Sequence, residues 1–84
     1  MKEIYQTVYS PYYGSVEKVL VNQSSHVYEW ETLFLIKTKE QTEVEVSIGV
    51  SGYITSVKVA QGQEVTPDTV LSTLRDDLKI TGSD

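Results

Sequence analysis

The sequence predicts an all-β domain, a flattened β-barrel or sandwich of two antiparallel sheets. Three observations support this prediction. Apolar and polar residues alternate with a period of two in several short segments. Glycine, proline, asparagine and serine separate these segments, and no segment has the 3.6-residue period of a capped amphipathic helix. The chain has 84 residues, which is enough for one small domain.

Six segments are expected to be strands because valine, isoleucine, threonine and tyrosine dominate them. In chain order they are residues 4–9, 15–21, 31–38, 43–48, 53–59 and 69–74. Turns are expected at residues 22–25, 39–42 and 60–63, and around Pro11 and Pro67. We expect residues 1–75 to form a single domain, and residues 76–84 to form a polar C-terminal tail that frays.

An internal repeat is the most informative feature of the sequence. A shift of 38 positions overlays the two halves without a gap, placing Gly14 on Gly52 and Val16 on Ile54. The same shift matches Val19 with Val57, Val21 with Val59, Gln23 with Gln61, Val27 with Val65, Leu33 with Leu71 and Ile36 with Leu74. Each half is too small to bury its own apolar face. The repeat therefore predicts two antiparallel units, related by a pseudo-twofold axis, that share one core.

A hairpin connects the two units. Residues 33–48 read LFLIKTKEQTEVEVSI, with two strand-like runs on either side of a polar tip at residues 39–42. The hairpin should project from one end of the molecule. Lys39 lies in this tip beside Glu40, where the simplest interpretation is a solvated surface charge.

Composition excludes several classes of function. The absence of cysteine excludes disulfides and thiolate metal sites. A net charge of −5 argues against nucleic acid and against anionic membrane surfaces as partners. No apolar leader follows Met1 and no apolar run is long enough to cross a membrane, so we expect a cytoplasmic protein.

No catalytic or metal site is predicted. His26 is the only histidine, and we expect it to be an ordinary surface residue in a turn. The carboxylates include Glu43, Glu45, Asp76 and Asp77, and none has a base or nucleophile at a spacing typical of an active site.

Four aromatic residues are candidates for contacts with a partner. Tyr12 and Tyr13 lie in the turn that ends at Gly14, and Tyr28 and Trp30 lie in the connection before the hairpin. A tryptophan in a turn is a partner-contact candidate. The alternative is that Trp30 folds over an open end of the barrel and covers Val27 or Leu33.

Three stretches together resemble the biotinyl/lipoyl carrier domain family, which has the barrel-sandwich hybrid fold. They are SPYYGSVEKVLV at residues 10–21, LFLIKT at residues 33–38, and VSGYITSVKVAQGQEVTPDTVLSTL at residues 50–74. The last is the most specific, because its glycines and apolar residues have the family's spacing at Gly52, Val57, Val59, Gly62, Val65 and Leu71. The resemblance covers residues 9–75 and implies this fold for the whole domain.

The resemblance also implies a covalent cofactor site, from which this chain departs. Family members carry biotin or lipoate on a lysine at the hairpin tip, within Met-Lys-Met or Asp-Lys-Ala. Counting from Ile36 places the lysine position at Glu40, and counting back from Gly52 places it at Gln41. The hairpin is one residue longer than the family norm, and Lys39 lies one residue before the expected position.

Two functional hypotheses follow. The first is a stand-alone biotinyl/lipoyl-like domain with no prosthetic group, which acts as a non-catalytic protein-interaction module through Tyr12, Tyr13, Tyr28 and Trp30. The alternative is a divergent biotin or lipoate carrier, modified at Lys39, that serves a carboxylase or a 2-oxo-acid dehydrogenase complex. A third possibility, a relative of the same fold in membrane efflux adaptors, lacks the helical hairpin and anchor of those proteins. Neither main hypothesis is an enzyme, and we expect a protein partner and a monomer or weak dimer.

Overall fold

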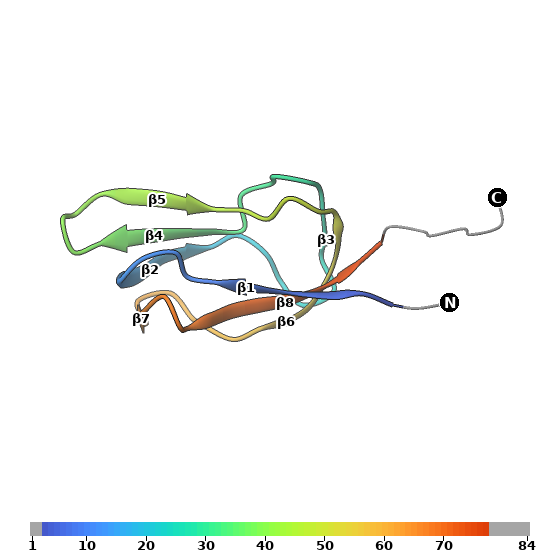
Figure 1. Ribbon diagram of the computed structural model, residues 1–84. Coiled ribbons are helices and arrows are strands. Elements are labelled where there is room, and N and C mark those ends of the chain that lie inside the picture. Colours follow the sequence, from blue (N-terminus) through green and yellow to red (C-terminus); the bar gives the residue numbers. More distant parts are fainter. Residues whose placement is uncertain (1–2, 78–84) are drawn as a thin grey trace, which may run out of the picture.

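The computed structural model describes residues 3–77, which form eight strands in two antiparallel sheets (Figure 1). The sheets have the strand orders β1-β8-β6-β3 and β5-β4-β2-β7. The strands are β1 (Tyr5–Tyr9), β2 (Gly14–Val19), β3 (His26–Val27), β4 (Phe34–Thr38), β5 (Glu43–Val46), β6 (Gly52–Val57), β7 (Glu64–Val65) and β8 (Val70–Asp76). This arrangement confirms the predicted all-β sandwich. Residues 3–77 contain no helix that is long and apolar enough to span a membrane.

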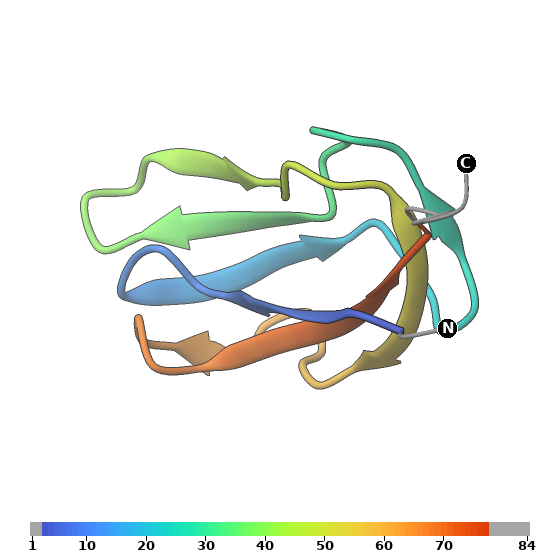
Figure 2. The same cartoon turned by 45° about the vertical axis from the view of Figure 1, so that its right-hand side comes forward.

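One hydrophobic core lies between the two sheets, and Figure 2 shows β5 and β4 (green) above β1 and β8 (dark blue and orange). Each sheet contributes its inward-facing side chains, and Phe34 and Ile36 from β4 are completely buried, as are Leu71 and Leu74 from β8. The remaining buried apolar side chains are Val8, Val16, Val21, Val27, Leu33, Val46, Ile54, Val59 and Val65. Neither half of the chain could bury these side chains alone, as the repeat predicts.

The pseudo-twofold symmetry extends to irregularities of the strands. The pairing of β2 with β4 shifts register between Val16 and Lys18, and the pairing of β6 with β8 shifts between Ile54 and Ser56. These two bulges lie 38 positions apart, which is the spacing of the sequence repeat.

The turns obey the same symmetry and connect the two halves. Ser24 and Gly62 both have a positive φ, of 75° and 89°. The amide of Ser24 donates to the carbonyl of Ile54 at 2.7 Å, and the amide of Gly62 donates to the carbonyl of Val16 at 2.7 Å. Each half therefore places its turn against a strand of the other half, which is how the two units come to share one core.

Strand boundaries differ from the prediction in several places. The strands β1, β2, β4, β5 and β6 are shorter than predicted. Val21, Leu33 and Val59 lie outside these strands and are nevertheless buried. An alternating apolar pattern indicates which side chains are buried, and it does not show which residues pair with a neighbouring strand. The two-residue strands β3 and β7 are too short for alternation to reveal them.

Two predictions near the ends of elements are wrong. His26 does not lie in a turn, because it belongs to β3 and pairs with Tyr53. The tail does not begin at residue 76, because Asp76 ends β8 and Asp77 makes hydrogen bonds to the domain. Residues 78–84 of the predicted tail lie outside the described residues.

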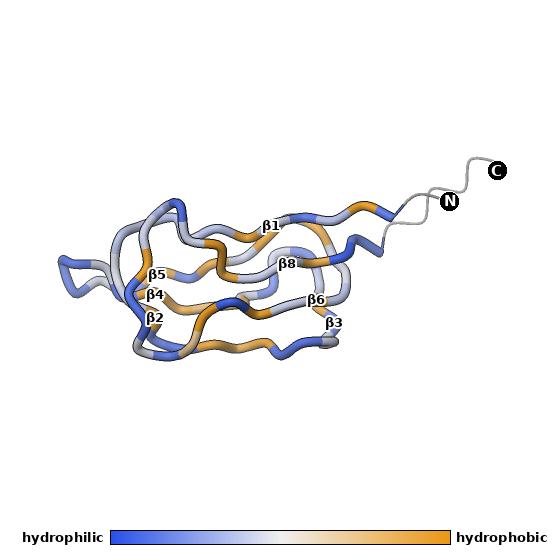
Figure 3. Tube along the Cα trace, turned by 90° about the horizontal axis from the view of Figure 1, so that it is seen from below, coloured by the Kyte–Doolittle hydropathy of each residue, from blue (hydrophilic) through white to orange (hydrophobic). Residues whose placement is uncertain are grey.

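The β4–β5 hairpin projects from one end of the molecule, as expected (Figure 1). The start of β1 and the end of β8 lie at the opposite end. The hairpin tip is hydrophilic, in contrast to the apolar stretches within the strands (Figure 3). This arrangement presents the tip far from the end where the described chain begins and finishes.

Candidate functional site

The hairpin tip is a three-residue loop closed by Thr38 and Thr42. The amide of Thr38 donates to the carbonyl of Thr42 at 2.8 Å, and the amide of Gln41 donates to the carbonyl of Thr38 at 2.9 Å. Gln41 has a φ of 68°, so the last loop residue is in the left-handed region. A tight turn followed by a left-handed residue is the usual geometry of three-residue hairpin loops, in which the left-handed residue forms a bulge. Lys39 and Glu40 are thus the exposed residues at the apex.

Lys39 lies beside a shallow hollow next to the hairpin. Its Nζ is 5.7 Å from the centre of the Tyr13 ring, a distance at which an ammonium group and an aromatic face attract each other. The hollow has a volume of about 370 Å³ and is lined by Tyr12, Tyr13, Thr38, Lys39 and Glu40. The turn that carries both tyrosines is held by Ser10, whose buried hydroxyl donates to the carbonyl of Tyr12 at 2.6 Å. The structure therefore brings Lys39, Tyr12 and Tyr13 together.

A second hollow, of about 470 Å³, adjoins the first and lies between the hairpin and β7. Lys37 and Lys39 line it on the hairpin side, and Glu64 lines it on the side of β7. The surroundings of the tip are consequently polar and of mixed charge.

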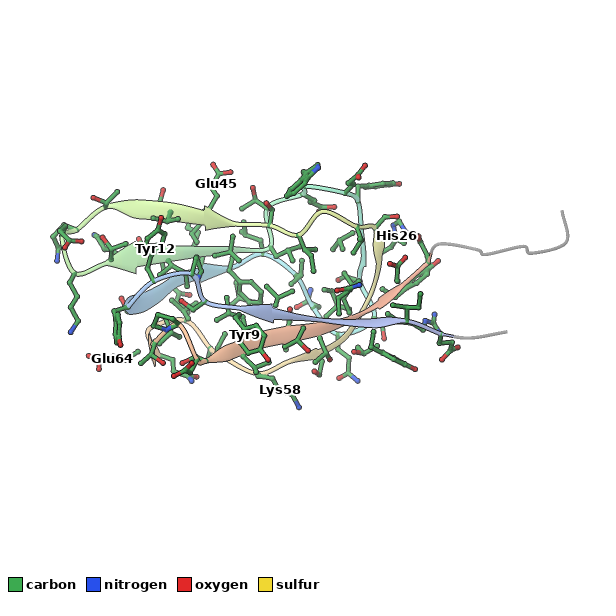
Figure 4. All side chains as sticks on the ribbon, in the orientation of Figure 1. Tyr9, Tyr12, His26, Glu45, Lys58 and Glu64 are labelled. Atoms are coloured by element: carbon green, nitrogen blue, oxygen red, sulfur yellow. The ribbon has the colours of Figure 1, made fainter. Side chains whose placement is uncertain are left out.

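Tyr28 lies toward the opposite end of the molecule, beside His26, and Trp30 lies against Gly49, so the four candidate aromatic residues do not form one surface. The centres of the Tyr28 and His26 rings are 5.0 Å apart in an edge-to-face arrangement, and those of the His26 and Tyr53 rings are 4.8 Å apart in a similar one. In Figure 4 the labels of Tyr12 and His26 mark these two ends of the sandwich.

Trp30 adopts an unusual backbone conformation and stays exposed. Its φ is 64°, and its amide donates to the carbonyl of Ile48 at 2.8 Å. The indole lies against Gly49, where an added Cβ would come within 2.7 Å of the ring. The side chain nevertheless remains 68% exposed, close to the 69% of Tyr28. Trp30 therefore covers Gly49 with one part of the ring and offers the rest to solvent.

A polar cluster that the sequence does not predict joins β3 to the end of β8. His26 Nε2 lies 2.8 Å from Asp77 Oδ2, and the Ser51 hydroxyl donates to Asp77 Oδ1 at 2.7 Å. The hydrogen bond with His26 lowers the pKa of Asp77 below its usual value, and the hydrogen bond from Ser51 lowers it further by a smaller amount. Because 51 positions separate His26 from Asp77, no local pattern could have paired them. Both groups bond to the carboxylate, so the cluster holds the end of β8 in place.

The lowered pKa of Asp77 predicts a loss of stability in acid. A carboxyl group with a lowered folded-state pKa stabilises the fold above its unfolded value of about 4, and this contribution disappears as the pH falls through the folded value. Asp77→Asn should therefore lower the melting temperature at pH 7 and have little effect near pH 3. Thermal unfolding followed by circular dichroism tests this, with Glu40→Gln at the exposed tip as the control. An equal effect of Asp77→Asn at both pH values would contradict the assignment.

Two of the other carboxylates singled out in the sequence are on the surface. Glu43 and Glu45 are exposed on β5, and Glu45 accepts a hydrogen bond from the Thr32 hydroxyl at 2.8 Å. Among residues 3–77 no three histidine or acidic side chains are placed to bind a metal ion.

Comparisons with known proteins agree with this geometry. No significant match was found among curated protein sequences. The crystal structure of urea carboxylase from Kluyveromyces lactis matches with a TM-score of 0.77 and 20% sequence identity. The match covers 88% of this chain and 6% of that one, so this chain corresponds to a small part of the larger protein. At this identity the likeness concerns the fold.

A family model gives the more specific result. The Biotin_lipoyl model, described as "Biotin-requiring enzyme", matches residues 6–74, which is most of the chain. Domains of this kind are carriers and not themselves catalysts. The two pseudo-symmetric sheets and the projecting hairpin agree with this match. The chain therefore belongs to the biotin/lipoyl domain family.

Proposed function

We propose that this chain is a biotin/lipoyl domain without a prosthetic group, and that it acts as a non-catalytic protein-interaction module. The first half of the proposal rests on the hairpin tip, where counting along the chain puts Glu40 or Gln41, and not a lysine, at the position that the family modifies.

The bulge at the hairpin tip supports this assignment. The two counts for the lysine position, from Ile36 and from Gly52, disagree by one residue because the hairpin is one residue longer than the family norm. A bulge inserts one residue into one strand of a hairpin, and the left-handed Gln41 is that residue. When Gln41 is set aside, both counts give Glu40.

The chemistry of the tip points the same way. Biotin and lipoate are attached through an amide bond to a lysine amine, and a glutamate carboxylate offers no nucleophilic nitrogen. The residues on either side of Glu40 are Lys39 and Gln41, where the family has methionine in biotin carriers, and aspartate and alanine in lipoate carriers. A ligase that recognises the family's hairpin tip would meet no lysine amine at Glu40, and none of the residues that usually flank the lysine.

Attachment of a cofactor can be tested directly. Incubation of the purified chain with ATP and either biotin ligase and biotin, or lipoate ligase and lipoate, should leave its intact mass unchanged. An authentic carrier domain in the same reaction verifies that each ligase is active. The double change Glu40→Lys with deletion of Gln41 restores the amine and the family length, and is expected to gain about 226 Da with biotin or 188 Da with lipoate. A gain by the unaltered chain would overturn the proposal.

Trp30 supports the second half of the proposal. A left-handed backbone costs a bulky residue about 1–2 kcal/mol relative to glycine, because its Cβ crowds the backbone. Contact with Gly49 recovers part of this cost, yet most of the ring faces solvent. Strained residues with exposed aromatic side chains concentrate at binding sites, because the contact with the partner offsets their cost.

Binding through Trp30 gives a prediction of its own. Trp30→Ala should keep the fold, because the side chain is mostly exposed, and should weaken binding of the partner by at least about tenfold if the ring is a binding hot spot. Affinity capture from the native host with the unaltered chain and with Trp30→Ala would identify proteins that depend on the ring. Leu20→Ala, also an exposed apolar side chain but just after β2, is the matched control. Equal capture by all three chains would contradict a role for Trp30.

The exposure of Lys39 favours one alternative function. Its amine lies at the apex of the tip, over Tyr13, where an enzyme has access to it. If the unaltered chain gains mass in the ligase reactions and Lys39→Arg abolishes the gain, the chain is a divergent carrier modified at Lys39. In that case it would serve a carboxylase or a 2-oxo-acid dehydrogenase complex.

A further inference from the structure

The strand β1 forms the edge of its sheet and leaves half of its backbone groups open. In Figure 3 the strands β1, β8, β6 and β3 follow one another across the sheet, with β1 outermost. The amide of Asp76 in β8 donates to the carbonyl of Ile4 at 2.8 Å. Because bonding directions alternate along an antiparallel strand, the even-numbered residues of β1 bond to β8. The amides and carbonyls of Tyr5, Thr7 and Tyr9 therefore point away from the sheet.

The other half of the molecule contains a matched edge for comparison. β5 is the edge of the second sheet and corresponds to β1 under the 38-residue repeat. At the positions equivalent to Tyr5 and Thr7 it carries Glu43 and Glu45, both exposed. Charged side chains on an edge strand prevent pairing with another strand, because bringing like charges together is unfavourable. The edge at β5 is protected in this way, and no residue from Tyr5 to Tyr9 is charged.

The sequence of β1 is nearly a palindrome. It reads YQTVY, with Thr7 at the centre and a tyrosine at each end. Tyr5 and Tyr9 are exposed, at 58% and 53%, and Thr7 between them is exposed too. A symmetric contact between two copies of a chain requires a surface that is complementary to itself, and a palindromic strand meets this requirement when it pairs in an antiparallel sense.

We propose that β1 pairs with β1 of a second copy of this chain, around a twofold axis through Thr7. Thr7 then lies opposite Thr7 of the second copy, and Tyr5 lies opposite Tyr9. All three residues have their open amides and carbonyls on this edge, so the register satisfies them with about six hydrogen bonds. Aromatic and threonine pairs across strands are both favourable. The product is one continuous antiparallel sheet that runs through both copies.

The contact is small, so we infer a weak dimer. One short strand per chain places the interface in the class of transient contacts, which corresponds to a dissociation constant between about 1 μM and 1 mM. The proposal is independent of the proposed function, because the hairpin tip and Trp30 belong to other strands and connections.

Sedimentation equilibrium over a range of protein concentrations tests the association. The unaltered chain should change from monomer to dimer as its concentration rises to about 1 mM. Thr7→Glu places on β1 the charge that Glu45 carries on β5, and should abolish the dimer while the fold is retained. Thr42→Glu, at the exposed hairpin tip, makes the same change in charge and should leave the dimer intact. A monomer at every concentration, or a dimer unaffected by Thr7→Glu, would overturn the proposal.

Cysteine cross-linking tests the register, because the natural chain has no cysteine. Opposed residues in a hydrogen-bonded antiparallel pair have Cα atoms about 5.5 Å apart, within the range that a disulfide bridges. Mild oxidation should therefore link Thr7→Cys to itself. It should link Tyr5→Cys to Tyr9→Cys in a mixture and link neither of these to itself. Efficient self-linking of Tyr5→Cys without that of Thr7→Cys would contradict the proposed axis.

Discussion

Gly14→Ala is expected to unfold the domain. A Cβ at this position would overlap the backbone carbonyl oxygen of Lys37, and that oxygen belongs to β4, which carries the hairpin. No side-chain rotation relieves a collision with backbone, so β2 and β4 would have to separate. We expect a loss of at least about 4 kcal/mol of unfolding free energy. For a chain of this size that is most or all of the total stability, which is about 4–13 kcal/mol.

Two other glycines provide controls for this prediction. Gly52 is the pseudo-symmetric equivalent, and its Cβ would overlap the carbonyl oxygen of Arg75, so Gly52→Ala should be equally severe. Gly62 has no atom within reach of an added Cβ, and its φ of 89° is the only obstacle. Gly62→Ala should therefore cost only about 1–2 kcal/mol. Urea denaturation followed by circular dichroism measures all three variants, and similar stabilities for Gly14→Ala and Gly62→Ala would contradict the packing.

Phe34→Ala is expected to destabilise the domain by about 3–5 kcal/mol. Phe34 is the only phenylalanine and is among the largest of the completely buried side chains. Its removal leaves a cavity between the two sheets, which strands paired on both sides cannot easily collapse to fill. Because β4 is also the first strand of the hairpin, the variant should expose the hairpin backbone to hydrogen exchange.

Leu20→Ala is the matched control for Phe34→Ala. Leu20 is apolar and 48% exposed, and its amide donates to the carbonyl of Leu33. Alanine keeps that backbone hydrogen bond, so the change should cost no more than about 1 kcal/mol. Denaturant unfolding that gave equal losses for the two variants would show that the core is not centred on Phe34.

The repeat explains why so much of the fold was predictable. Gly14 and Gly52 mark equivalent close approaches of two backbones, and the apolar residues that follow them mark equivalent inward faces. The need for glycine at a close approach and for apolar residues on an inward face depends on neighbouring positions in the chain. Each half of the fold has both needs, so the same pattern occurs in both halves of the sequence. The strands β3 and β7 were missed because two residues give too little alternation to detect.

The candidate site was only partly predictable, for a different reason. The sequence places Lys39 at the hairpin tip, but the fold decides that its amine lies over the Tyr13 ring. The contact of His26 with Asp77 likewise depends on bringing distant segments together, and no spacing rule reveals it. No pattern in the sequence divides the four aromatic residues, and only the folded chain places Tyr12 and Tyr13 beside the hairpin tip and Tyr28 beside His26.

The central claim is that this member of the biotin/lipoyl family carries no cofactor, because Glu40 stands where the lysine is expected. The most direct test is the intact mass of the protein purified from its own host, where the physiological ligases have had access to it. We predict the mass of the unmodified chain. A form heavier by about 226 Da or 188 Da, the masses added by amide-linked biotin or lipoate, would contradict the claim. Peptide mapping of that form to Lys39 would establish the chain as a carrier.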